Sequence, residues 1–277
     1  MKESIPSAFA CIRKRGLRDV LGLAATLFLS LSTGSYGLAA DFTAEQVRSQ
    51  LPGSGGTAPA DFSGRDLSDL DLSGMNFNNA NLSGASLFSA HLVSSNFQGA
   101  DLKKANLNGA WLMGTDFRHA NLSESSLMGI VVLGGEVQKR PNFMNAKLTR
   151  ARIMGDLPGA DLSHADLAYA NLGVDIKNQG MGQMRTDLSG ANLSGANLTG
   201  ANLNRALLAF AHLENANLTG ANLFRAKLAG ADLTGADVSK ADFTEADLDG
   251  TIFRNVTGLD TAIGLDKAAN RDHAIFK

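Results

Sequence analysis

The residues from Asp187 to Ala206 read DLSGANLSGANLTGANLNRA, which is a five-residue phrase repeated without an insertion. Each phrase holds a central Leu, an Ala two residues before it, and three residues that are mostly small or polar. From Leu188 to Phe253 a large apolar residue, usually Leu, recurs at every fifth position. Any fold of this chain must satisfy that period of five.

A period of five excludes both ordinary amphipathic elements. A helix has about 3.6 residues per turn, so the central residues would spread over all of its faces. A regular strand needs an apolar residue at every second position, whereas the inward candidates here are spaced two and then three residues apart. The pattern fits a short extended segment followed by a corner, with Leu and Ala facing inward. Repetition of this kind is typical of a solenoid.

Larger side chains indicate how many segments make one coil. Phe77, Phe97 and Phe117 occupy central positions that are twenty residues apart. Twenty residues correspond to four sides of five residues each. Coils stacked in register would place each Phe about 4.8 Å from the next, the spacing of paired strands. The sequence therefore predicts a four-sided cross-section.

The triplet Ala-Asn-Leu carries a resemblance to a known family. It stands at residues 80–82, 105–107, 120–122, 191–193, 196–198 and 216–218. The chain resembles the pentapeptide repeat family, whose motif is A(D/N)Lxx, over roughly residues 60–256. That resemblance implies an all-β fold, the right-handed quadrilateral parallel β-helix, and it does not fix an activity.

Residues 1–40 resemble an export signal peptide. A basic stretch precedes the apolar run Val20–Leu31, which is shorter than the ~20 residues of a membrane span, and small residues follow. We expect cleavage after Ala39 or Ala40, with an uncleaved membrane anchor as the alternative. The mature chain should then contain no membrane span.

The remaining chain divides into three segments. Residues 41–59 are expected to form a capping helix, begun by a capping box of Thr43 and Gln46, and a linker. Residues 60–256 hold the pentapeptide repeats, with interruptions at 134–142, 154–159 and 173–186. Residues 257–277 are expected to form a C-terminal helical cap, for which Thr257 and Asp260 supply a capping signal.

Charge and cysteine content argue against several classes of function. Without residues 1–40 the chain has 20 basic and 25 acidic residues, a net charge of −5. Its one cysteine, Cys11, lies in the predicted signal, so the mature chain would have no Cys nucleophile or Cys-based metal site. The five histidines show no metal-ligand spacing, and there is no phosphate-binding or dinucleotide motif. We therefore expect no catalytic residue, metal site or cofactor.

One outward surface of the first repeat block is unusually apolar. Stacking at twenty residues places His91, Trp111 and Val131 in one ladder and further apolar residues beside it. Elsewhere the outward positions hold Ser, Asn, Thr, Gly or charged residues, so we expect this patch to be covered. The candidate interaction patch consists of Phe88, His91, Val93, Trp111, Met113, Met128, Val131 and Leu133.

Two coverings of this patch remain open. The first is a lid from the same chain, supplied by the N-terminal helix or a later loop. The second is a protein partner or a second copy of the chain, since buried Trp and Met are favoured at interface centres. A second ladder is expected among Arg205, Arg225 and Glu245, in which the last pair should attract.

These observations favour a non-catalytic, exported structural or interaction scaffold that binds proteins through a face of the β-helix. The expected compartment is a periplasm or, alternatively, a thylakoid lumen. The alternative function comes from the resemblance, because one branch of the family mimics DNA and engages DNA gyrase. Those proteins are strongly acidic, dimeric and cytoplasmic. This chain is nearly neutral, has five basic and no acidic residues between 137 and 155, and carries an apparent export signal. No nucleic-acid partner is expected.

Overall fold

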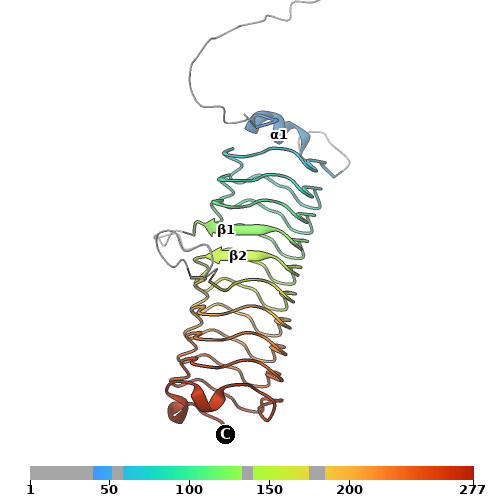
Figure 1. Cartoon of the computed structure of the whole chain (residues 1–277). Coiled ribbons are helices and arrows are strands. Elements are labelled where there is room, and N and C mark those ends of the chain that lie inside the picture. Colours follow the sequence, from blue (N-terminus) through green and yellow to red (C-terminus); the bar gives the residue numbers. More distant parts are fainter. Residues whose placement is uncertain (1–39, 52–58, 133–139, 175–184) are drawn as a thin grey trace, which may run out of the picture. The chain divides into compact units, whose positions relative to one another are not determined.

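The structure, a computed structural model, describes residues 40–51, 59–132, 140–174 and 185–277. These residues belong to one compact unit, Leu38–Lys277. In Figure 1 the repeats form coils stacked along one axis, with the helix α1 at the end where the repeats begin and the C-terminal residues at the other end. The predicted export signal, up to residue 39, lies outside the described residues, as do residues 133–139 and 175–184 of the predicted interruptions.

The core is filled by the two apolar positions of each repeat. Central residues such as Leu82 and Leu198 are fully buried, and so are the alanines two positions before a centre, such as Ala80 and Ala201. Because Ala is small, the backbone can approach the axis at that position while Leu fills the remaining space. The five-residue period is thus the spacing of inward-facing side chains, as predicted.

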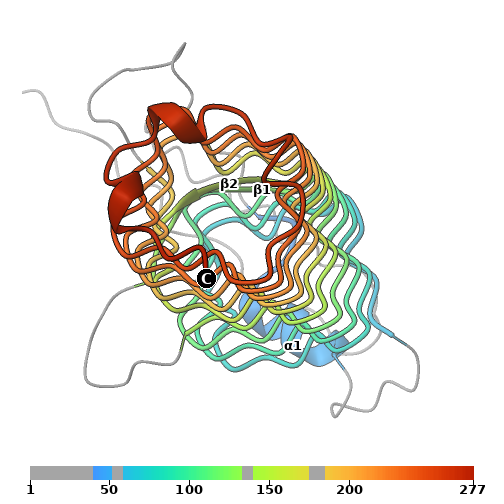
Figure 2. The same cartoon turned by 90° about the horizontal axis from the view of Figure 1, so that it is seen from below.

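Consecutive coils are joined by parallel, in-register bridges on each of four sides. One ladder runs through Asp61, Asn81, Asp101, Asn121, Lys147, Asp166, Asn197, Asn217, Asp237 and Thr257. Viewed along the axis, the coils outline a four-sided tube (Figure 2). The fold is a right-handed quadrilateral parallel β-helix, which confirms the predicted fold class.

Most sides are too short to form a regular strand. Among the described residues, β1 (Ser126–Ile130) and β2 (Arg152–Gly155) are the two segments that qualify, and they pair in parallel. Other sides contribute a single bridging residue before the chain turns. Each side therefore needs a corner that closes within two or three residues.

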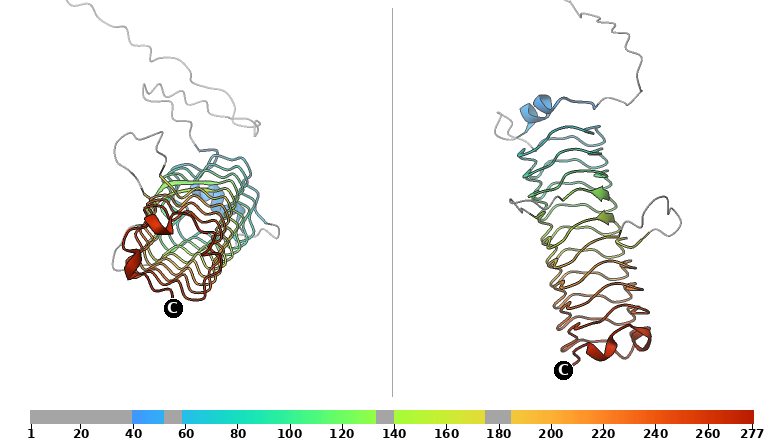
Figure 3. Two further views of the ribbon diagram at one scale, coloured as in Figure 1. Left: turned by 60° about the horizontal axis from the view of Figure 1, so that its bottom comes forward. Right: turned by 90° about the vertical axis from the view of Figure 1, so that its left-hand side faces the viewer.

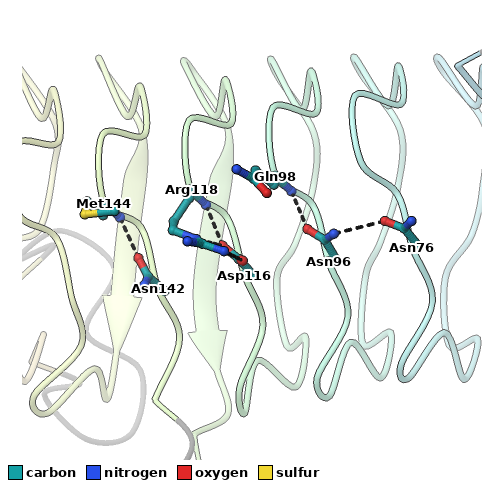
Figure 4. Close-up of polar contacts among 7 residues, drawn as sticks. All are labelled: Asn76, Asn96, Gln98, Asp116, Arg118, Asn142 and Met144. Atoms are coloured by element: carbon teal, nitrogen blue, oxygen red, sulfur yellow. Dashed lines mark hydrogen bonds and ion pairs between the residues drawn. The ribbon is translucent and has the colours of Figure 1, made fainter.

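The Asn or Asp of the motif closes that corner. Figure 4 shows one ladder of these residues on consecutive coils. The side-chain oxygen of Asn96 accepts the backbone N–H of Gln98 at 2.9 Å, and Asp116 accepts that of Arg118 at 3.0 Å. Asn96 also donates through Nδ2 to Asn76 on the preceding coil, at 3.0 Å. A short acceptor that reaches the backbone two residues on explains why the motif needs Asn or Asp.

The interruptions change the length of a coil and leave the ladders intact. Asp116 pairs with Asn142, 26 residues on, whereas Asn142 pairs with Asp161, 19 residues on. The shorter coil arises where Met128 pairs with Met154 but Ile130 pairs with Gly155, a register shift that removes one residue from β2. The chain therefore absorbs each slip of phase at a corner.

At the N-terminal end, α1 (Ala44–Gln50) packs on the first coil. The predicted capping box is present, with Thr43 and Gln46 exchanging side-chain and backbone hydrogen bonds. Val47 is fully buried, and Phe42 meets Phe62 of the first coil edge-on, with ring centroids 5.8 Å apart. The helix therefore covers core side chains that the first coil would expose.

At the C-terminal end the ladders continue through one further coil. Thr257, Ile263, Ala269 and Ile275 each bridge a residue of the preceding coil. The predicted capping role of Thr257 is wrong, because Thr257 bridges Asp237; the short 3₁₀ helices η2 (Leu265–Lys267) and η3 (Arg271–His273) instead follow Gly264 and Asn270. Extra residues at the corners hide the period here although the stacking persists, and Figure 3 shows both helices at the end of the stack. Within the described ranges, no helix has the length and apolar character needed to cross a bilayer.

Candidate interaction surface

The predicted Trp111 ladder forms as expected. His91 bridges Asp71 and Trp111, and Trp111 bridges Val131, so these residues project from one side of successive coils. The rings of His91 and Trp111 stack with centroids 4.7 Å apart and an interplanar angle of 30°. His91 is exposed and Trp111 is partly buried. We call this side of the coils the Trp111 face.

A second apolar ladder lies beside the first on the same face. The backbone N–H of Ser94 donates to the carbonyl of Met113 at 2.8 Å, which places Val93 and Met113 on neighbouring rungs. Both side chains are only partly buried, as is that of Val131. His91, Val93, Trp111, Met113 and Val131 thus form a contiguous surface, which we call the apolar section.

The structure does not bring Phe88 and Met128 together. Both lie on the adjoining side, where Asn108 occupies the coil between them: Ser89 donates to the carbonyl of Asn108, and Gly109 donates to that of Met128. A spacing of forty residues is two coils, so an intervening polar rung separates the two side chains. Phe88 is 46% exposed and Met128 is partly buried. Leu133, the last member of the predicted patch, lies outside the described residues.

The expectation that α1 covers this patch is not met by the packing of α1. The helix buries Val47 and Leu51 against the first coil, and Asp41 beside it binds the backbone of Asp66. Trp111 belongs to the third coil of its ladder. A covering loop from the first interruption would fall outside the described residues.

Beyond Val131 the same face contains a cavity of about 400 Å³. Its lining includes Ile130 and Leu207 as apolar groups and Asp156 and Asp187 as acidic groups. It opens where β2 shifts register, at Gly155. A Cβ on Gly155 would lie 2.8 Å from the side chain of Ile130, so the close approach of the two coils there requires glycine.

A second cavity of about 390 Å³ lies at the edge of the Trp111 face, and its lining is mainly basic. Arg185, Arg205, Arg225, Lys227 and Glu245 line it. The predicted attraction between Arg225 and Glu245 is confirmed, since Nε of Arg225 lies 2.6 Å from the Glu245 carboxylate. Lys227 pairs with Asp247 at 3.3 Å.

The second cavity contains one residue that the sequence pattern does not reveal. Arg185 is separated from the preceding repeat by the interruption 173–186, so its register cannot be counted from earlier coils. Its alignment with Arg205 can be counted only backward from the regular repeats that follow. The signal that could have found it is this backward spacing of twenty residues.

The carboxylate beside Lys227 is held in its charged form. Burial raises the pKa of Asp247, but hydrogen bonds from Asn270 and Lys227 and the positive charge of Lys227 lower it more, so the pKa lies below its ordinary value. Asn270 Nδ2 donates to Asp247 at 2.7 Å. In the described part of the chain, no group of three or more His, Cys, Asp or Glu side chains is placed to hold a metal ion.

Comparison with known proteins decides the family. The model for pentapeptide repeats matches residues 60–93, 95–131, 186–223 and 221–257, with eight copies of the repeat. The chain belongs to the pentapeptide repeat family. The matched segments cover both the apolar section and the basic cavity, so both are built on pentapeptide repeat coils.

Several solved pentapeptide repeat structures are similar to this chain. HetL, involved in heterocyst differentiation regulation in the cyanobacterium Nostoc sp. strain PCC 7120, is 30% identical, with 78% of this chain and 87% of HetL covered and a TM-score of 0.47. A protein of the Arabidopsis thaliana thylakoid lumen is 30% identical over 41% of this chain and 69% of its own, with a TM-score of 0.25. QnrB1, a plasmid-mediated fluoroquinolone resistance protein, is 21% identical over 69% of this chain and 93% of its own, with a TM-score of 0.28. No curated protein matches the chain.

Proposed function

We propose that this pentapeptide repeat protein is a non-catalytic, exported scaffold that binds a protein partner through the apolar section of the Trp111 face. The observation that carries the proposal is the stack of His91 on Trp111, flanked by Val93, Met113 and Val131, on a surface whose side chains are incompletely buried. Aromatic residues and Met are enriched at the centres of protein interfaces.

The rigidity of the scaffold supports this role. Each coil is held to its neighbours by backbone hydrogen bonds, such as that from Leu92 N–H to the carbonyl of Trp111 at 2.9 Å. Side chains on such a frame are pre-positioned, so a partner that docks there loses less conformational entropy. A second copy of the chain could use the same section, and the experiment below distinguishes the two.

Export is inferred from residues 1–40, whose pattern is that of a signal peptide. The destination that we propose is a periplasm, with a thylakoid lumen as the alternative. The lack of cysteine after Cys11 suits either compartment, because folding would require no disulfide chemistry. Mass spectrometry of the exported protein should find a new N-terminus after Ala39 or Ala40, and an intact N-terminus in the cytoplasm would contradict export.

The DNA-mimicking alternative receives no support from the Trp111 face. A mimic of the DNA backbone presents a continuous negative surface, whereas this face carries an apolar section and then a cavity lined by four basic side chains. The similarity to QnrB1 is too low to argue for a shared activity. We therefore do not adopt that alternative.

The test compares Trp111→Asp with Asn106→Asp, a matched control on an adjoining side of the same coil that also adds one carboxylate. Complexes would be cross-linked in intact cells, and the mass of each purified protein would be measured in solution. We expect one discrete hetero-complex with the wild type and Asn106→Asp, and its loss with Trp111→Asp. Dimers of the pure wild type that Trp111→Asp abolishes would instead identify a second copy as the occupant. A folded Trp111→Asp variant that keeps every complex of the wild type would refute the proposal.

A further inference from the structure

We propose that the cavity lined by Arg185, Arg205 and Arg225 binds an oxyanion, either a carboxylate or a phosphate group. This site lies on later coils than the apolar section, so it is independent of the proposed protein-binding function. The cavity measures about 390 Å³, which is within the range of small-ligand sites.

The three arginines occupy one corner of successive coils. Arg205 and Arg225 share the left-handed conformation, with φ of 58° and 57°, and the backbone of Arg205 donates to Phe224 of the next coil at 2.8 Å. Neighbouring rungs of a parallel ladder are about 4.8 Å apart. Guanidinium groups stacked at that spacing repel one another unless an anion lies among them.

The protein supplies counter-charges at only one end of this corner. Arg225 is paired with Glu245 on the following coil, and Lys227 is paired with Asp247. No carboxylate in the described part of the chain pairs with Arg185 or Arg205. The positive charge is therefore least compensated at the end of the cavity toward Arg185.

Arg205 also has unused hydrogen-bonding capacity. Its Nε atom is buried and has no hydrogen-bond partner among the described residues. A charged donor left without an acceptor is unfavourable, and an oxyanion that enters the cavity would supply acceptors to this guanidinium after a small side-chain rotation. This is the specific deficiency that a ligand would correct.

Arginine suits the proposed ligand because its planar fork donates two parallel hydrogen bonds to a carboxylate or phosphate. The position of Arg225 is fixed in advance. Its guanidinium carbon lies 4.9 Å from the centroid of the Phe224 ring, and its Nε is bound to Glu245. The two terminal nitrogens of Arg225 are not used in that ion pair and are free to contact an anion.

The experiment measures binding by calorimetry at constant ionic strength. One arm uses inorganic phosphate and the other an acetylated peptide of Asp and Glu, because the two probes separate a free phosphate from a carboxylate on a larger partner. The variants are Arg205→Gln and a matched control, Arg152→Gln, which removes an exposed arginine from another side of the tube. Thermal melts confirm that each variant is folded.

We expect the wild type and Arg152→Gln to bind at least one probe at millimolar concentration or below, and Arg205→Gln to bind it at least about tenfold more weakly. Binding of phosphate alone would assign a free anion, and binding of the peptide alone or of both would assign a carboxylate-bearing partner. If Arg205→Gln does not fold, Arg185→Gln, at an exposed position, replaces it. The proposal is wrong if neither probe binds the wild type, or if a folded variant binds as tightly as the wild type.

Discussion

The imidazole of His91 lies against the indole of Trp111 on the next coil, with ring centroids 4.7 Å apart. Trp111 is the only tryptophan of the chain, so its fluorescence reports on the apolar section alone. Removing the imidazole with His91→Ala should expose one face of the indole to water. We expect the emission maximum to move to longer wavelength.

The control for that measurement is His164→Ala, which removes a histidine at a corner away from the Trp111 face. The ring of His164 lies over Gly195 of the next coil and not over an aromatic residue. Its removal should leave the emission unchanged. An identical spectrum for His91→Ala and the wild type would show that the stack does not shield Trp111.

Inside the tube, the ring of Phe97 is stacked between those of Phe77 and Phe117, with centroid distances of 4.6 and 5.2 Å. Phe97→Ala should leave a cavity that rigid neighbouring coils cannot fill, at a cost of about 3–5 kcal/mol. The exposed Phe210 provides the contrast, because it is 70% exposed. Phe210→Ala should change stability by no more than about 0.5 kcal/mol. Urea unfolding would give both values, and equal effects would contradict the assignment of the core.

Two glycines at corners separate backbone strain from side-chain crowding. Gly190 and Gly200 have φ of 62° and 61°, but a Cβ would meet nothing within 4 Å at Gly190, whereas at Gly200 it would lie 2.7 Å from the ring of Tyr169. Gly190→Ala should therefore cost only the left-handed strain, roughly 1 kcal/mol. Gly200→Ala should cost more, because the tyrosine ring must move.

Thermal unfolding in the Tyr169→Ala background tests this explanation. Without the ring, Gly200→Ala should cost no more than Gly190→Ala. If the extra cost persists after Tyr169 has been removed, the crowding is not the cause.

Asp237 should make the fold sensitive to acid. Side-chain and backbone hydrogen bonds from Ser239 lower the pKa of this carboxyl, with smaller contributions from Thr219 and Thr257. Because the folded pKa lies below the unfolded one, the stabilisation is complete above the unfolded value, about 3.9, and is lost as the pH falls through the folded value. The melting temperature of the wild type should therefore decrease in that range.

Asp237→Asn keeps a side-chain oxygen for the N–H of Ser239, as Asn217 does one coil earlier for Thr219, and it removes the titrating group. Its melting temperature should fall less between about pH 5 and pH 3 than that of the wild type. Melts at several pH values would measure the difference. Parallel curves for the two proteins would exclude Asp237 as a contributor.

Much of the fold could be predicted because the period is carried by individual residues. Leu82 and Ala80 face inward because a side of five residues offers two inward positions, and the spacing of Phe77 and Phe97 gives the length of a coil. The ladder of His91, Trp111 and Val131 follows from the same count. Predictions failed where residues had been added at corners, as at Thr257, because a bridge depends on the position after the corner and not on the number of residues within it.

By itself, the sequence determined which side chains fill the tube and that one coil has four sides, since both follow from a local period that burial of Leu and Ala enforces. Only the tertiary structure decided what meets across an interruption. Gly155 packs on Ile130 at a shift in register, and Arg185 joins the corner of Arg205 after a gap in the repeats. Those contacts depend on how hydrogen bonds between coils realign the chain after each insertion, which is a long-range effect that no local spacing encodes.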